Sequence, residues 1–166
     1  MVLFPAEFNC SRSLRKTLRN GPYTTRVDHA FGATIRGCAA PRRGGPDTWL
    51  NDDMIDSYEQ LHELGYGHSI ETYDADQLAG GLYGIQLGQI FFGESMFSLR
   101  RDASKVALAR LVEECRARDI ELIDCQVASP HLASLGAREV SRAQFVALLR
   151  RYARREASGS WATAGA

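Results

Sequence analysis

The sequence predicts an α+β fold in which helices pack on a mixed central sheet. Its 166 residues are 45% apolar and 24% charged, with 20 acidic and 20 basic side chains, a composition typical of one globular domain and not of a disordered chain. Helical and strand periodicities alternate along the chain in an order that favours helices layered on a sheet. The uninterrupted apolar stretches are short, so no membrane span is predicted.

The first part of the chain predicts two helices separated by a strand. Residues 11–20 form an amphipathic helix that a serine can cap, and residues 23–28 form the strand. Asp28 is then expected to cap a helix whose buried face carries Phe31, Ile35 and Cys38.

The rest of the chain predicts one further helix, a meander of three strands, and a closing helix–strand–helix run. A helix begins at Asn51 or Asp52 and ends at Gly65. The remaining elements are expected as strands at 68–74, 77–86 and 89–98, a helix at 104–118, a strand at 121–128 and a helix at 142–154. This order is the one expected of the acyltransferase (GNAT-like) fold, with its splayed central sheet.

The zero net charge conceals a strong segregation along the chain. Residues 1–45 hold eight Lys or Arg against two acids, residues 46–98 hold ten acids and no Lys or Arg, and residues 99–166 hold twelve bases against eight acids. The basic start suits a polyanion and the acidic middle suits a cationic ligand.

The cysteines and histidines do not indicate a metal site. Four cysteines lie without metal-ligand or redox spacing, so we expect reduced thiols, and the four histidines show no zinc pattern. We therefore expect neither a metal nor a bound cofactor.

The loop before the helix at residue 104 disfavours one class of acyl donor. Coenzyme A would need a glycine-rich turn at this helix start to hold its pyrophosphate, and residues 98–105 contain no glycine. Arg100, Arg101 and Lys105 can still hold phosphate by their side chains, so a coenzyme A-dependent N-acetyltransferase remains an alternative.

Three polar residues near apolar strands are candidates for chemistry. Asp124 and Gln126 are two apart on a predicted strand, so both are expected on one face, where a carboxylate and an amide can orient an amine. Glu94 lies among apolar neighbours, where its burial is costly unless it meets a cation. Each of the three is also compatible with a satisfied buried polar group.

Four blocks resemble the bacterial leucyl/phenylalanyl-tRNA–protein transferases and occur in that family's order. They are SRSLRK at 11–16, LHELG at 61–65 with HS at 68–69, GGLYG at 80–84 through FGESMFS at 92–98, and LIDCQV at 122–127 with SLGA at 134–137. Members of the family move Leu or Phe from aminoacyl-tRNA to a protein beginning with Arg or Lys, which marks that protein for degradation.

The resemblance implies a role for each of several groups of residues. The catalytic group corresponds to Asp124, Gln126 and Glu94. The pocket for the aminoacyl side chain corresponds to Leu82, Phe91, Leu108, Leu111, Cys115 and Ile123. The tRNA-binding residues correspond to Arg12, Arg15, Lys16, Arg19 and Trp49.

The chain departs from the family in two ways. Leu111 and Cys115 stand where aromatic residues can occur, which predicts a wider pocket and Met as a further donor. The family's N-terminal lobe is expected to be absent, which leaves open a different amine acceptor or an inactive homologue that only binds tRNA or peptide.

The resemblance also implies a domain layout and a setting. We expect a basic lead-in strand and helix at 1–20, a GNAT-like aminoacyltransferase domain at 21–155 and a flexible tail at 156–166. The partners are then aminoacyl-tRNA and a protein or peptide with N-terminal Arg or Lys, without a membrane, and the protein is expected to be a cytoplasmic monomer.

Overall fold

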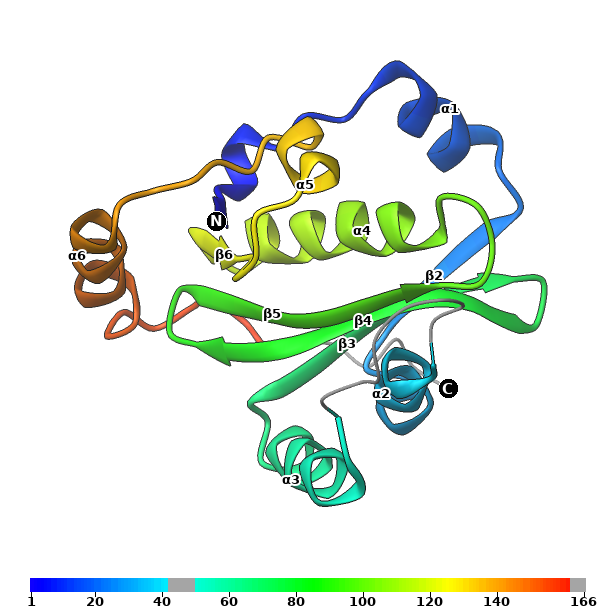
Figure 1. Cartoon of the computed structure of the whole chain (residues 1–166), viewed down its shortest axis with the longest axis horizontal. Coiled ribbons are helices and arrows are strands. Elements are labelled where there is room, and N and C mark those ends of the chain that lie inside the picture. Colours follow the sequence, from blue (N-terminus) through cyan, green and yellow to red (C-terminus); the bar gives the residue numbers. More distant parts are fainter. Residues whose placement is uncertain (42–49, 162–166) are drawn as a thin grey trace.

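The computed structural model describes residues 1–41 and 50–161 (Figure 1). In chain order its elements are β1 (Val2–Leu3), η1 (Pro5–Glu7), α1 (Arg12–Asn20), β2 (Tyr23–Val27), α2 (Phe31–Ala39), α3 (Asp52–Glu63), β3 (Gly67–Asp74), β4 (Gln77–Leu87), β5 (Ile90–Ser98), α4 (Ala103–Ala117), β6 (Leu122–Asp124), α5 (Pro130–Ser134) and α6 (Arg142–Tyr152). The predicted α+β architecture is confirmed.

One mixed sheet of six strands forms the centre of the fold. The strand order is β1-β6-β5-β4-β3-β2, and the neighbours pair antiparallel except for β5 and β6, which run parallel. The parallel pair is joined through α4, because a parallel connection must cross from one end of the sheet to the other. This is the acyltransferase (GNAT-like) fold that the element order predicts.

Helices cover both faces of the sheet. In Figure 1, α4 lies on one face together with α1, α5 and α6, while α2 and α3 lie on the other. The face under α4 is closed by apolar side chains that recur at helical spacing, namely Leu108, Leu111, Val112 and Cys115, all buried. Burying one such aliphatic side chain contributes roughly 1.5–3 kcal/mol relative to leaving it exposed, so this row fixes α4 against the sheet.

Side-chain caps fix where the main helices begin. The Ser11 hydroxyl accepts from the backbone N–H of Leu14 at 3.2 Å, and the Asn51 amide oxygen accepts from the N–H of Met54 at 2.9 Å. Ser141 and Gln144 form a reciprocal capping box at α6. Each cap satisfies a backbone donor that the helix leaves unpaired.

The prediction that Asp28 caps α2 is wrong. Asp28 has a left-handed φ of 53°, and its carboxylate accepts instead from the backbone N–H of Ser69 at 2.7 Å and contacts His68 Nδ1 at 2.8 Å. The buried Glu71 of β3 accepts from the N–H of His29 at 3.2 Å, just before the helix. The N-cap of α2 is Ala30, which makes no side-chain capping hydrogen bond.

Two short elements, η1 and α5, are absent from the sequence prediction. Each has five residues or fewer, too few for a periodicity to emerge. None of the helices in the described ranges is long and apolar enough to cross a membrane.

Candidate functional site

A cavity opens where β5 and β6 part. The two strands pair only as far as Phe92 and Asp124, after which β5 continues to Ser98 without β6 beside it. The cavity has a volume of about 390 Å³ and lies against the unpaired stretch of β5, under α4 and α5. Its lining residues are Leu82, Tyr83, Gly93, Glu94, Ser95, Met96, Leu108, Leu111, Ile123, Asp124, Cys125, Gln126, Val127, Ser129, His131 and Leu132.

A β-bulge places Glu94 at the mouth of the parted strands. On β4, Tyr83 pairs with Ser95 and the next residue, Gly84, pairs with Gly93, so Glu94 has no partner opposite it. Such a bulge re-aims a side chain out of the regular alternation. Gly84 is required here, because a Cβ on it would lie 2.1 Å from the carbonyl oxygen of Phe92.

Glu94 links two elements that are distant in the sequence. Its Oε2 accepts from the Gln126 amide Nε2 at 3.1 Å, and its carboxylate is hydrogen-bonded to the Tyr58 hydroxyl from α3. Burial, followed by the charge of Glu94, raises the pKa of Tyr58 to about 12. The tyrosine therefore remains a neutral donor to this carboxylate.

Asp124 and Gln126 do come together, although not in the predicted way. Strand β6 ends at Asp124, and Gln126 has a left-handed φ of 56°, so the two residues do not alternate along one strand over 121–128. The Asp124 Oδ1 instead accepts from the backbone N–H of Gln126 at 2.9 Å and holds the turn. A non-glycine residue in this region is held against a steric cost, which is common where function fixes geometry.

The candidate pocket residues divide into two groups. Four of them, Leu82, Leu108, Leu111 and Ile123, line the cavity and form its apolar floor. Phe91 and Cys115 are fully buried and are absent from the lining. They pack in the same core, so they can act on the cavity only through the side chains that surround them.

The cavity wall contains a thiol and an imidazole whose pKa values are shifted in opposite directions. Burial, together with the charge of Asp124, raises the pKa of Cys125 to about 11, so its thiol stays protonated near neutral pH. Burial and nearby Lys105 lower the pKa of His131. An apolar floor beside the carboxylates of Glu94 and Asp124 and the amide of Gln126 suits a ligand with an apolar side chain next to a cationic amine.

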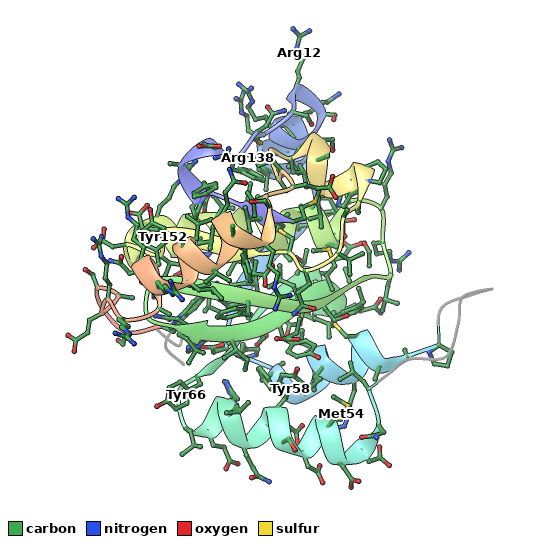
Figure 2. The ribbon with its side chains drawn as sticks, turned by 60° about the vertical axis from the view of Figure 1, so that its left-hand side comes forward. Arg12, Met54, Tyr58, Tyr66, Arg138 and Tyr152 are labelled. Carbon is green, nitrogen blue, oxygen red and sulfur yellow. The ribbon has the colours of Figure 1, made fainter. Side chains whose placement is uncertain are left out.

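The predicted basic residues gather on α1. Arg12, Arg15, Lys16 and Arg19 line one hollow along this helix, which contains no acid. Figure 2 shows Arg12 projecting from the body of the molecule at the outer end of the helix. Leu14 holds α1 to the core, so the charged face is presented on a fixed support. Trp49 lies outside the described residues.

A second, larger hollow lies elsewhere in the molecule. Its volume is about 710 Å³, and it lies between the start of β3 and the segment that follows α6, with Trp161 stacked on His68 at 4.3 Å between ring centroids. It lacks the polar cluster of Glu94, Asp124 and Gln126, so the smaller cavity is the candidate site.

Residues 2–150 match the family model described as "Leucyl/phenylalanyl-tRNA protein transferase". The chain belongs to this family. It is 53% identical over 150 residues to the leucyl/phenylalanyl-tRNA–protein transferase of Chromobacterium violaceum, an alignment that covers 90% of this chain and 64% of that protein. The corresponding protein of Cellvibrio japonicus is 53% identical over 148 residues, covering 89% of this chain and 63% of that protein. The chain thus spans less than two thirds of the length of these family members.

A solved structure supports the fold independently of the family match. AAC(6')-Iy in complex with the bisubstrate analog CoA-S-monomethyl-acetylneamine superposes with a TM-score of 0.52 at 16% identity, covering 72% of this chain and 93% of that chain. At this identity the likeness concerns the fold alone.

Sequence reasoning missed several residues of this family member's cavity. Met96 and His131 line it, and Tyr58 reaches Glu94 from the other face of the sheet. Tyr58 belongs to the apolar stripe predicted for its helix, so only the sheet bulge at Glu94 reveals that its hydroxyl meets a carboxylate. His131 follows a proline in the short helix α5, which gives no periodic signal.

Proposed function

We propose that this chain transfers an aminoacyl group from aminoacyl-tRNA to an amine, with Leu or Phe as the preferred donors and Met as a further one. The proposed acceptor is the N-terminal amine of a protein or peptide that starts with Arg or Lys, so that the added residue marks the protein for degradation. The observation that carries the proposal is the hydrogen-bonded cluster of Glu94, Gln126 and Asp124 at the rim of an apolar cavity, in a chain of this family.

The apolar floor is proposed to hold the side chain of the donated amino acid. Leu82, Leu108, Leu111 and Ile123 present only hydrocarbon to the cavity, which suits Leu, Phe or Met. A hydrophobic pocket separates ligands that differ by one methylene by only about 1–3 kcal/mol, so discrimination among these donors is expected to be weak.

The polar rim is proposed to position the attacking amine. In the reaction the amine nitrogen forms a bond to the ester carbonyl carbon, the bond to the tRNA ribose oxygen breaks, and the proton lost by the amine passes to that ribose. An amide is almost non-basic near neutral pH, so we assign Gln126 to orienting the amine and Asp124 and Glu94 to stabilising its positive charge.

The charge distribution supports both partners. The four basic side chains of α1 suit the phosphates of tRNA, and the run of ten acids without a Lys or Arg over 46–98 suits an acceptor that begins with Arg or Lys. All of these groups come from one chain, so we propose that the protein works as a monomer, in the cytoplasm where charged tRNA is available.

Coenzyme A remains the donor to test against tRNA, because the fold is shared with an acetyltransferase. Two of the three cations near the start of α4 are already engaged: Lys105 Nζ lies 2.7 Å from an Asp102 carboxylate oxygen and Arg101 Nε lies 3.6 Å from the other. A pyrophosphate at this place would compete with that carboxylate, which disfavours coenzyme A.

The deciding experiment offers both donors to the protein. Labelled Leu-tRNA, Phe-tRNA, Met-tRNA and acetyl-coenzyme A are each incubated with peptides that begin with Arg, Lys, Ala or Glu. We expect label on the Arg and Lys peptides from the tRNA donors, with small differences among these donors. Label only from acetyl-coenzyme A, or transfer that is indifferent to the first residue of the peptide, would overturn the proposal, and binding without transfer would favour an inactive homologue.

A further inference from the structure

Helix α6 and the segment that follows it carry an arginine-rich surface that lies outside the candidate site. Residues 142–155 contain five arginines and no Asp or Glu. All five side chains are exposed, and none of them forms an ion pair within the described residues. These arginines, called the α6 surface below, are Arg142, Arg150, Arg151, Arg154 and Arg155.

Several other arginines of the described chain are engaged in ion pairs. Arg36 pairs with Glu59, Arg138 with Glu7, and Arg118 with Glu114. The α6 surface therefore concentrates unpaired guanidinium groups in the same manner as α1.

The helix dipole explains only part of this arrangement. Arg150 and Arg151 lie in the last turn of α6, where a cation is favoured. Arg142 is the first residue of the helix, where a cation is disfavoured, and Arg154 and Arg155 lie beyond its end. Five like charges in so short a segment repel one another, and a bound polyanion would relieve that repulsion.

Part of the surface is held in place by an aromatic ring. The guanidinium carbons of Arg151 and Arg155 lie 5.1 and 5.9 Å from the centroid of Tyr152, which is itself buried. The carbonyl of Tyr152 accepts from the N–H of Gln89 at 3.0 Å, which ties the end of α6 to the β4–β5 turn. A guanidinium fork held in this way loses less freedom when it binds a phosphate in a bidentate manner.

Helix α6, with Arg142, Arg150 and Arg151, lies on the same side of the central sheet as α1, while Arg154 and Arg155 follow the helix and line the hollow at the start of β3. Figure 1 shows α1 and α6 at opposite ends of the layer that carries α4 and α5, and Figure 2 keeps both helices on the side away from α2 and α3. The segment with Asp124 and Gln126 ends β6 and leads into α5, between these two helices. One long polyanion can thus contact both basic helices while its end enters the cavity.

We propose that the α6 surface is a second phosphate-binding surface for the body of the tRNA, separate from α1. This inference rests on the proposed function for the identity of the polyanion. The arginines contact the phosphodiester backbone and carry no sequence information, so they add affinity to any tRNA and leave the choice of amino acid to the cavity.

The test compares two double variants that remove the same charge. Arg150→Gln/Arg154→Gln alters the α6 surface without touching the two arginines that stack on Tyr152. Arg26→Gln/Arg36→Gln alters two exposed arginines away from α1 and α6, one on strand β2 next to Tyr73 and one on α2. Binding of uncharged leucine tRNA is measured for both variants and for the wild type from about 50 to 300 mM salt, and thermal unfolding confirms that each variant is folded.

Each phosphate contact contributes about 0.7–0.9 to the slope of log affinity against log salt. Loss of two contacts reduces the magnitude of this negative slope by about 1.4–1.8. At ~0.1 M salt, that reduction corresponds to a 25- to 60-fold weaker affinity. We expect this change for Arg150→Gln/Arg154→Gln and a slope change below about 0.5 for the control. With charged tRNA, KM rises and kcat stays unchanged, because the cavity is intact.

An unchanged slope in Arg150→Gln/Arg154→Gln, with transfer intact in the wild type, would overturn this inference and leave the proposed function standing. A lowered slope in a protein that transfers nothing would keep the inference and overturn the proposed function. Vesicles containing phosphatidylglycerol form the last arm: tighter binding to them than to tRNA, lost only in the α6 variant, would assign the surface to a membrane and overturn the inference.

Discussion

Replacing Gln126 by glutamate would set two carboxylates against each other at the cavity rim. The Gln126 Nε2 lies 3.1 Å from Glu94 Oε2, so the new oxygen would meet a like charge at about that separation. Two unit charges at this distance repel by about 1.3 kcal/mol in bulk water and about 5 kcal/mol at an effective dielectric of 20. Gln126 is exposed, so the lower part of this range applies, about 1–2 kcal/mol.

The substitution predicts a further pH dependence of the transfer rate, caused by the second carboxyl group. One of the two carboxyl groups holds a proton to higher pH than a lone carboxyl does, so Gln126→Glu loses transfer rate as pH rises from 5 to 8. The swapped double variant Glu94→Gln/Gln126→Glu restores an N–H to oxygen hydrogen bond with its direction reversed.

The assay is a double-mutant cycle on the transfer rate and on the free energy of unfolding at pH 5 and pH 8. We expect a favourable coupling of about 1–2 kcal/mol at pH 8 that shrinks at pH 5, with Gln126→Ala as the uncharged control. If the swapped variant unfolds as easily as Gln126→Glu, and the pH has no effect on the difference, the proposed contact between these two side chains does not operate.

Three further predictions concern the cavity and the core. Leu111→Phe places a larger side chain in the apolar floor, so Phe transfer should fall at least tenfold more than Leu transfer in steady-state rates, and equal losses would contradict the assignment of the floor. The raised pKa of Cys125 predicts alkylation by iodoacetamide that is slow near pH 7.5 and accelerates toward pH 11, whereas rapid labelling of the folded protein at neutral pH would contradict its burial. Burial raises the pKa of Glu71 above 4.5, so its contribution to stability is complete below the unfolded-state value and declines as pH rises through the folded-state value. Glu71→Gln should therefore reduce the loss of unfolding free energy on going from pH 5 to pH 8, measured by urea unfolding, and an unchanged pH dependence would refute this.

The helices and strands in which apolar residues recur at a regular spacing were predictable from the sequence. The helix expected at 104–118 is α4 (Ala103–Ala117), because its apolar residues recur at three and four positions and meet one face of the sheet. The three strands of the meander are also confirmed to within one residue at each end.

The features that shape the site were not predictable, because they interrupt the regular strand geometry on which the sequence pattern depends. The bulge at Glu94 and the left-handed φ of Gln126 depend on how β5 meets β4 and where β6 ends, which no local pattern records. For the same reason the face shared by Asp124 and Gln126 was predicted from a strand that stops at Asp124.

The proposed transfer is tested most directly by one covalent product, a peptide extended at its N-terminus by the donated residue. A peptide beginning with Arg is incubated with Leu-tRNA and the protein, and its intact mass and fragment masses are determined, with the N-acetylated peptide and Asp124→Asn as controls. We expect one added leucine on the free α-amine, none on the acetylated peptide, and a rate reduced at least 100-fold in Asp124→Asn with tRNA binding unchanged. An unmodified peptide at full tRNA binding, or equal rates for Asp124→Asn and the wild type, would contradict the proposed transfer.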